Sequence, residues 1–273
     1  MRAAGASRQT PPFCVLRPPF RWYNRHQFPP GAAMRTRLLP LAALLAVAAT
    51  LTAAQEPKKD PPKQPAKQEP NAVLAAVEDV PGLPRVLLIG DSISMGYTLP
   101  VREQLKNVAN VHRPPTNCGP STRGVEQIEK WLGGGKWDVI HFNFGLHDLK
   151  FVDEKGMNTS PEKGKLQVPI EDYKKNLDAL VSRMKKTGAK LIFATTTPVP
   201  AGEPQRKADS DKEYNAAALE VMKKHCVAVN DLDEFVRGRK GDGQLPKNVH
   251  FTADGSKALA ERVSAEVKKA LGK

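Results

Sequence analysis

Ser92 lies in a segment whose residue types could support nucleophilic chemistry. The four apolar residues from Val86 to Ile89 predict a buried strand, and Gly90-Asp91 interrupts it before a helical pattern begins. A serine at such a strand-to-helix turn is exposed and lies close to backbone N–H groups, which stabilise negative charge on a reacting oxygen. Ser92 could equally serve as the N-cap of the following helix. The segment alone does not separate a nucleophile from a cap.

The elements that would position Ser92 are strands and helices in alternation. Strands are predicted at residues 85–89, 108–113, 137–143, 190–195 and 227–231. Helices are predicted at residues 98–106, 124–132, 173–184 and 210–225, and Thr252 can cap a last helix. Strands separated by helices favour a parallel sheet with helices on both faces. Ligands of such sheets bind at the carboxyl ends of the strands.

Four short segments lie where this sheet would bind a ligand. Three follow successive strands and the fourth precedes the last helix: Gly90-Asp91-Ser92, Asn117-Cys118-Gly119, Gly145-Leu146-His147-Asp148 and Val249-His250. This ordered set resembles the SGNH (GDSL-type) hydrolase superfamily, and the resemblance spans residues 85–270. It implies an α/β fold of three layers, α/β/α, with a five-stranded parallel sheet of the flavodoxin-like kind.

The resemblance also implies roles for individual residues. Ser92 would be the nucleophile and His250 the general base, because a hydroxyl is a poor nucleophile until a base takes its proton. The backbone N–H groups of Ser92 and Gly119 and the side chain of His147 would form the oxyanion hole that stabilises the tetrahedral intermediate. The resemblance implies no metal and no organic cofactor, and the sequence contains no HExxH pattern or close pair of histidines.

His147 is the first departure from the family pattern, which usually has asparagine at this position. A neutral imidazole can donate one N–H, so it could replace the amide. It is bulkier and titrates near neutral pH. His147 could instead bind substrate or orient its loop, and we expect the oxyanion role.

Lys247 is the second departure, because the family usually has aspartate three residues before the histidine. Lysine cannot accept the imidazole N–H, and disabling the orienting aspartate of a triad costs roughly 10⁴ in rate. Either a backbone carbonyl orients His250, giving a Ser-His dyad, or an acid from a nearby loop such as Asp231 or Asp242 does so. We expect the dyad; weak or absent activity is a third possibility.

Three further residues are expected to support the site without taking part in the chemistry. Asp91 is expected to shape the turn that holds Ser92 through side-chain hydrogen bonds to the backbone. Asp148 is expected to do the same for its own loop. Asn117 accompanies Gly119 in the second segment.

The N-terminal part of the chain differs in composition from the rest. Residues 1–33 are expected to be a disordered extension or an artefact of the chosen start site, and residues 34–54 a secretory signal peptide with small residues before a cleavage point. Residues 55–80 are expected to be a linker rich in Pro, Lys and Gln, and residues 81–273 the catalytic domain. The protein is therefore expected to be secreted or periplasmic, with no stable membrane span after signal cleavage.

The charge and cysteine content exclude some classes of partner. The net charge is +13, but the basic residues of the domain are interleaved with acidic ones and form no aromatic-basic stripe. We therefore expect no nucleic-acid partner. Cys118 and Cys226 lie in the domain, and the sequence does not decide whether they are bridged.

These observations together predict a serine esterase. The resemblance, together with the expected signal peptide, implies small acyl esters as substrates, above all acetyl groups on carbohydrate, so the expected partner is a small-molecule or glycan ester. A lipase-like or thioesterase-like hydrolase of the same fold is one alternative. A catalytically weak glycan-binding relative is another, because Lys247 and His147 both depart from the family pattern.

Overall fold

The computed structural model describes residues 72–273. The extension at residues 1–33, the signal peptide at residues 34–54 and the first part of the linker, to residue 71, lie outside the described residues.

The described residues fold around one parallel sheet of five strands. The strands are β1 (Arg85–Ile89), β2 (Asn110–His112), β3 (Val139–Phe142), β6 (Lys190–Ala194) and β7 (Ala228–Asn230). They lie in the order β2-β1-β3-β6-β7, and every neighbouring pair is parallel. The predicted sheet is confirmed. Its strands are buried on both faces, which is why they appear in the sequence as continuous apolar runs.

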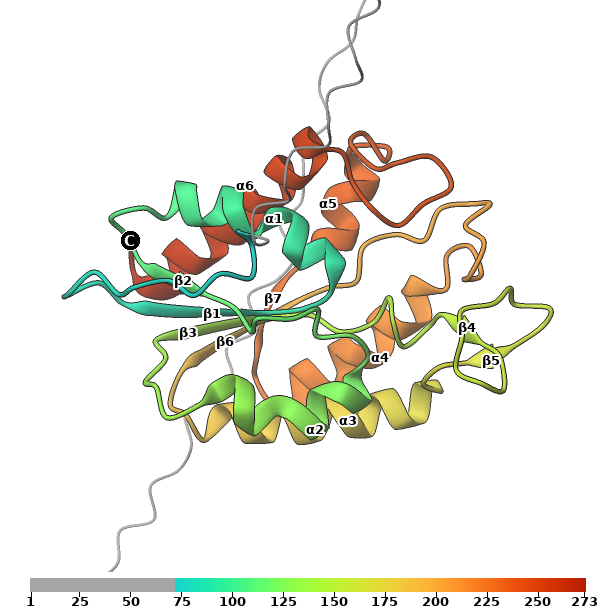
Figure 1. Cartoon of the computed structure of the whole chain (residues 1–273), viewed down its shortest axis with the longest axis horizontal. Coiled ribbons are helices and arrows are strands. Elements are labelled where there is room, and N and C mark those ends of the chain that lie inside the picture. The colour runs from blue at the N-terminus through green and yellow to red at the C-terminus, as the bar shows by residue number, and fades with distance from the viewer. Residues whose placement is uncertain (1–71) are drawn as a thin grey trace, which may run out of the picture. The chain divides into compact units, whose positions relative to one another are not determined.

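Helices cover both faces of the sheet and give the predicted three layers (Figure 1). Helices α1 (Ser92–Gln104), α5 (Leu232–Gly238) and α6 (Ala253–Leu271) lie on one face. Helices α2 (Ser121–Leu132), α3 (Ile170–Lys185) and α4 (Asp211–Lys224) lie on the other. The α/β fold is the flavodoxin-like arrangement that the sequence predicts.

Helix α1 begins at Ser92, earlier than the predicted start at residue 98. The side chain of Asp91 accepts a hydrogen bond from the backbone N–H of Ile93 at 2.9 Å, so Asp91 is the N-cap. The interpretation of Ser92 as the cap is therefore wrong, and its hydroxyl is left for another role. Gly96 allows α1 to pack closely on α6, because a Cβ there would lie 3.1 Å from Ser256 Oγ.

Helix α6 packs against α1 and sets the position of the loop that precedes it. Thr252 caps it as predicted, with its hydroxyl oxygen accepting from the N–H of Gly255 at 3.0 Å. Leu259, Val263 and Val267 form the predicted apolar stripe and are almost fully buried. Because α1 and α6 pack together, the residues just before each helix are brought close in space.

Helix α5 was not predicted, and neither were two further features of the domain. Residues 149–169 contain a small antiparallel pair, β4 (Phe151–Val152) and β5 (Lys165–Leu166), that extends from the end of the sheet. Residues 72–80, which the sequence assigns to the linker, pack against the domain. The Arg102 guanidinium donates to the carbonyls of Ala72 and Ala75 at 3.0 and 3.3 Å, and Asn110 exchanges hydrogen bonds with Val80.

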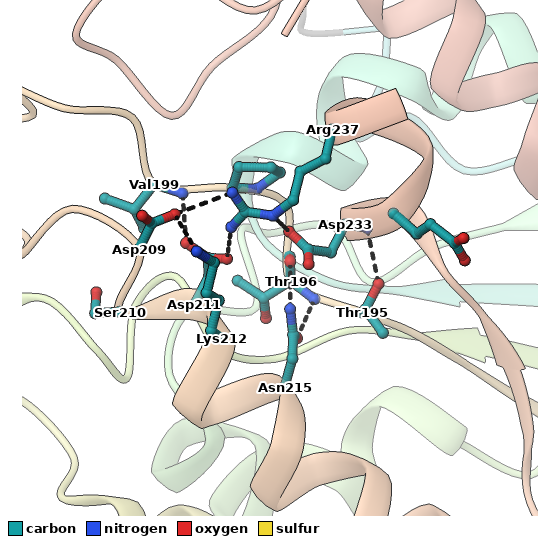
Figure 2. Close-up of polar contacts among 12 residues, drawn as sticks. Thr195, Thr196, Val199, Asp209, Ser210, Asp211, Lys212, Asn215, Asp233 and Arg237 are labelled. Atoms are coloured by element: carbon teal, nitrogen blue, oxygen red, sulfur yellow. Dashed lines mark hydrogen bonds and ion pairs between the residues drawn. The ribbon is translucent and has the colours of Figure 1, made fainter. Parts of the chain in front are cut away.

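The segment after β6 is held by a charged cluster around Arg237, which we call the Arg237 cluster (Figure 2). It consists of Arg237 and the carboxylates of Asp209, Asp211 and Asp233, all three of which Arg237 contacts. Asp211 is fully buried and also accepts the N–H of Val199 at 2.7 Å. Burial and the neighbouring Asp211 carboxylate raise the pKa of Asp233 to about 6, while Arg237 opposes the shift. The cluster joins α4 and α5 to the chain that leaves β6.

Among the helices of residues 72–273, none combines the length and hydropathy that a membrane span requires. Cys118 is buried, Cys226 is exposed, and both are free thiols.

Candidate active site

Ser92 and His250 meet at the carboxyl end of the sheet. The Ser92 Oγ and His250 Nε2 atoms are 2.9 Å apart, although the residues are 158 positions apart in the sequence. Ser92 is the first residue of α1, directly beyond β1, and His250 lies in the loop before α6. The packing of α1 on α6 makes this contact. A serine hydroxyl that donates to an imidazole nitrogen can lose its proton to it as the oxygen attacks a carbonyl.

Asn248 orients the His250 ring. Its Oδ1 atom lies 2.7 Å from His250 Nδ1 and also accepts the backbone N–H of His250 at 3.0 Å. Because an oxygen that accepts from a backbone N–H can only accept from Nδ1 as well, Nδ1 carries the ring proton. Nε2 is then unprotonated and available to the Ser92 hydroxyl. Asn248 thus fixes the tautomer of a neutral imidazole that a base requires.

The expectation that a backbone carbonyl orients His250 is therefore wrong. The two alternative acids are not the partners either. Asp231 caps α5 and accepts from Thr195 Oγ1, and Asp242 pairs with Arg239. Asn248 was not predicted, because the family pattern places the orienting acid at position 247. The available signal was a side-chain amide two residues before the histidine, close enough to fold back on the ring.

A cleft with a volume of about 420 Å³ opens beside Ser92 and His250. The predicted site residues Asn117 and His147 also line it. The remaining lining residues are Lys150, Asn158, Glu203, Pro204, Gln205, Arg206, Lys247, Asn248 and Val249. The structure thus brings together segments that follow β1, β2, β3 and β6 with the loop before α6.

His147 lines the cleft as a neutral imidazole. Burial lowers its pKa to about 4, and the charges of Lys150 and Arg206 act in the same direction. Within residues 72–273, the ring forms no hydrogen bond. A neutral ring retains one N–H, so His147 can donate to an oxygen in the cleft without carrying a charge.

Gly119 does not present a free amide to this cleft. Its φ of 67° places it in the left-handed region, and its N–H donates to Asn117 Oδ1 at 2.9 Å. Gly119 is also absent from the residues that line the cleft. With Oδ1 engaged by Gly119, the other end of the Asn117 amide is its NH₂ group, a donor on a lining residue. The predicted oxyanion role of the Gly119 amide is therefore not supported, and the segment contributes the side chain of Asn117 to the cleft instead.

The two predicted supporting carboxylates have different surroundings. Asp91 shapes the Ser92 turn through its cap hydrogen bond, as predicted. Asp148 is fully buried, and its Oδ1 accepts the N–H of Ser121 at the start of α2, at 2.9 Å. Asp148 therefore also fixes the start of α2, a segment outside its own loop, which the sequence does not predict. Burial raises the pKa of Asp148 to about 7.

Arg113 joins the turn of Ser92 to the segment of Asn117. This buried guanidinium donates to the carbonyls of Gly90 and Thr116, both at 3.2 Å, and to the hydroxyls of Ser94 and Thr98 at 3.3 and 2.9 Å. Its position behind the site was not predicted, since a lone arginine after a strand carries no distinctive sequence signal. Its hydrogen bonds hold the two segments in a fixed relation.

The comparisons with known proteins concern the family and the fold. The model of the GDSL-like Lipase/Acylhydrolase family matches residues 88–258. No curated protein matches the chain.

Solved structures share the fold at low sequence identity. A lipase/acylhydrolase from Enterococcus faecalis has a TM-score of 0.56 at 21% identity, covering 68% of this chain and 96% of that one. An acetyl xylan esterase has a TM-score of 0.55 at 16% identity, covering 67% and 99%. A GDSL-like lipase from Bacteroides thetaiotaomicron has a TM-score of 0.53 at 15% identity, covering 73% and 94%. The family match covers most of the chain, and the chain therefore belongs to the GDSL-like lipase/acylhydrolase family of ester-hydrolysing enzymes.

Proposed function

We propose that the protein is a serine esterase that removes small acyl groups, most simply acetyl, from carbohydrates or similar polar alcohols. The observation that carries this proposal is the 2.9 Å contact between Ser92 Oγ and His250 Nε2 at the edge of an open cleft. Asn248 completes the arrangement in place of the usual acid.

In the first half of the reaction, Ser92 Oγ attacks the ester carbonyl while its proton passes to His250 Nε2. The tetrahedral intermediate collapses, and the imidazolium returns the proton to the departing alcohol oxygen. The acyl group stays on Ser92. In the second half, His250 takes a proton from water as the water oxygen attacks the acyl carbon. The second tetrahedral intermediate collapses, the imidazolium returns the proton to Ser92 Oγ, and the acid leaves.

Asn248 acts by holding the tautomer and orientation of the ring. In a triad whose aspartate is replaced by an amide that stabilises the wrong tautomer, the loss is about 10⁴ in rate. Here the amide presents its oxygen to Nδ1, so the tautomer is the productive one. An amide lacks the negative charge with which a carboxylate stabilises the imidazolium. An asparagine also orients the catalytic histidine in the Cys-His-Asn arrangement of papain-like proteases.

The oxyanion would be stabilised by the Ser92 backbone N–H and by His147. A neutral imidazole donor is suited to this role because it adds no net charge that must be desolvated. The NH₂ group of Asn117 is a third donor, since Asn117 lines the cleft and its Oδ1 is engaged by Gly119.

The polarity of the cleft favours a polar alcohol over a lipid. Pro204 and Val249 are the only apolar residues that line it within the described part of the chain. A hydrocarbon chain gains about 0.8 kcal/mol for each buried CH₂ group, and only where apolar surface receives it. This observation argues against the lipase-like alternative.

A series of 4-nitrophenyl esters tests the proposal. We expect kcat/KM to be highest for the acetate and to fall for butyrate and octanoate. We expect Ser92→Ala to lower kcat by at least about 10³-fold without changing the thermal unfolding temperature. A preference for octanoate would favour the lipase-like alternative. No hydrolysis, or equal hydrolysis by the alanine variant, would favour the glycan-binding alternative or another nucleophile. Release of acetate from acetylated oligosaccharides then tests the alcohol.

We also propose that the protein is exported from the cytoplasm. The basic and apolar pattern of residues 34–54 supports export, with cleavage before residue 55. Expression of the full chain in a bacterium, followed by mass spectrometry of the exported protein, measures the mature N-terminus. Retention of residues 34–54 in a cytoplasmic product would contradict it.

A further inference from the structure

The cleft beside Ser92 carries an excess of positive charge. Three of its lining residues are cationic, Lys150, Arg206 and Lys247, and only Glu203 is acidic. At the strand ends of a hydrolase, a charge excess of this kind acts on whatever occupies the cleft, because the low-dielectric walls strengthen it.

Glu203 is already engaged and neutralises Arg206. Its Oε1 pairs with Arg206 Nη1 at 2.8 Å, and its Oε2 accepts the N–H of Gln205 at 2.9 Å. Both side chains of this pair are buried, and Arg206 Nε donates to the carbonyl of Leu146 at 2.8 Å. The pair is therefore a fixed part of the cleft wall, next to the residue that precedes His147. No carboxylate of the cleft remains for the two lysines.

Lys150 is half-buried and has no anionic partner among residues 72–273. Its ammonium forms neither a salt bridge nor a hydrogen bond there, and burial together with the charge of Arg206 lowers its pKa. A partly desolvated ammonium without a partner is unfavourable, and an anion placed beside it relieves that cost.

Lys247 is an exposed residue that lines the same cleft. Its φ of 53° is in the left-handed region, which is uncommon for a residue with a side chain. Its carbon stem passes over Gly202, where a Cβ would lie 3.1 Å from Lys247 Cγ and Cδ. The glycine leaves room for the stem, and within residues 72–273 the ammonium forms no ion pair. Lys247 therefore offers a second unneutralised charge at the same cleft.

We infer that this cleft selects esters whose alcohol portion carries a carboxylate, such as acylated acidic sugars, and that Lys150 and Lys247 bind that carboxylate. This inference rests on the proposed function. An acetyl group fills only a small part of a cleft of about 420 Å³, so the alcohol portion occupies the rest and is the part whose charge the lysines contact. The carboxylate of the substrate pairs with the two lysines, which Glu203 cannot do because it is already paired with Arg206.

Two acetyl esters that differ in one charge test the inference. 4-Acetoxybenzoate carries a carboxylate on the alcohol portion, and its methyl ester is neutral. We measure kcat/KM for both and compare the anionic-to-neutral ratio between proteins, so that differences in intrinsic reactivity cancel. We expect Lys150→Gln and Lys247→Gln each to lower the ratio about threefold, and the double variant about tenfold. Added NaCl should lower the ratio of the wild-type protein and have less effect on the double variant.

Lys130→Gln is the matched control, because Lys130 is an exposed lysine in the last turn of α2 and lies outside the cleft. We expect its ratio to equal that of the wild type. A double variant with the wild-type ratio would overturn the inference while leaving the proposed esterase intact. If neither ester is hydrolysed, the proposed function fails. Calorimetric binding of 4-hydroxybenzoate and its methyl ester then tests the charge preference alone, and equal affinities would overturn it.

Discussion

Two charged clusters lie beyond the carboxyl ends of the strands, and they differ in how their charges are met. In the Arg237 cluster, one guanidinium faces three carboxylates, and each carboxylate is paired with it (Figure 2). In the cleft, three cations face one carboxylate, which is already paired with Arg206. The His147 ring and the ammonium groups of the two cleft lysines form no hydrogen bond or ion pair within residues 72–273. A cluster whose charges are all paired within the protein stabilises the fold, whereas a cluster with unpaired donors and charges can bind a ligand that pairs with them.

Apart from the loss of Ser92 itself, the largest expected effect concerns His147, the hydrogen-bond donor of the cleft that has no acceptor among the described residues. We expect His147→Ala to lower kcat for 4-nitrophenyl acetate by about 10²–10³-fold, because it removes an oxyanion donor. We expect His147→Asn to retain most of the activity, since an amide also donates an N–H. Steady-state kinetics of both variants measure this. An alanine variant with wild-type kcat would place the oxyanion donors elsewhere.

In the Arg237 cluster the same kind of deletion should act on stability. We expect Arg237→Met to lower the free energy of unfolding by about 3 kcal/mol, because it leaves the fully buried Asp211 without its cation. The value is at the lower end for a buried pair, since the Arg237 side chain is 34% exposed. Urea unfolding measures it. Lys247→Gln is the contrasting variant, and an equal loss of stability there would remove the distinction between the clusters.

The role of Asn248 predicts a smaller effect on catalysis. We expect Asn248→Ala to lower kcat by about 10–100-fold, because the His250 ring loses the acceptor that fixes its tautomer. Asn248→Asp keeps an acceptor oxygen and adds a charge that stabilises the imidazolium, so its kcat should equal or exceed that of the wild type. Pre-steady-state measurement of acylation separates this step from deacylation. A wild-type rate in the alanine variant would show that Asn248 is dispensable.

The smallest expected effect concerns the pH dependence of stability. The pKa of Asp148 is raised by burial from about 3.8 to about 7, so the folded state holds a proton that the unfolded state has released. This contribution is present at low pH and is lost as the pH rises from about 4 through about 7. Asp148→Asn resembles the protonated form and should stabilise the protein at pH 8 by on the order of 2 kcal/mol. This is less than the full pKa shift would give, because the asparagine NH₂ group would replace Oδ2, which has no hydrogen-bond partner among the described residues. Urea midpoints across this pH range measure it.

Buried His141 should make the free energy of unfolding depend on pH in the opposite direction. Burial lowers its pKa to about 4, so the unfolded state binds a proton first as the pH falls. The stability contributed by the neutral ring is present above about 6.5 and is lost toward about 4. Asp148→Asn should therefore leave this acid-side loss in place. If Asp148→Asn left the free energy of unfolding at pH 8 unchanged, the prediction that burial destabilises the charged form of Asp148 would be wrong.

Much of this architecture follows from the sequence alone. Apolar runs such as Val86 to Ile89 predict buried strands because both faces of a parallel sheet are covered, and the alternation with helices predicts the sheet itself. The four polar segments predict which residues gather at the strand ends, and Ser92, Asn117, His147 and His250 do line one cleft. The location of these four residues is predictable because residues that follow the strands of a parallel sheet gather at its carboxyl edge, independently of how the side chains pack.

Only the tertiary structure decided which group each polar atom contacts. The close packing of α1 on α6 brings Ser92 to His250, Asn248 rather than a carbonyl or acid holds the imidazole, and Asn117 takes the Gly119 amide. These contacts depend on loop conformations that local sequence does not specify, because hydrogen bonds are directional and a shift of one residue changes the partner. The unpaired charge of the cleft has the same origin, since composition counts charges but only the fold shows which of them meet.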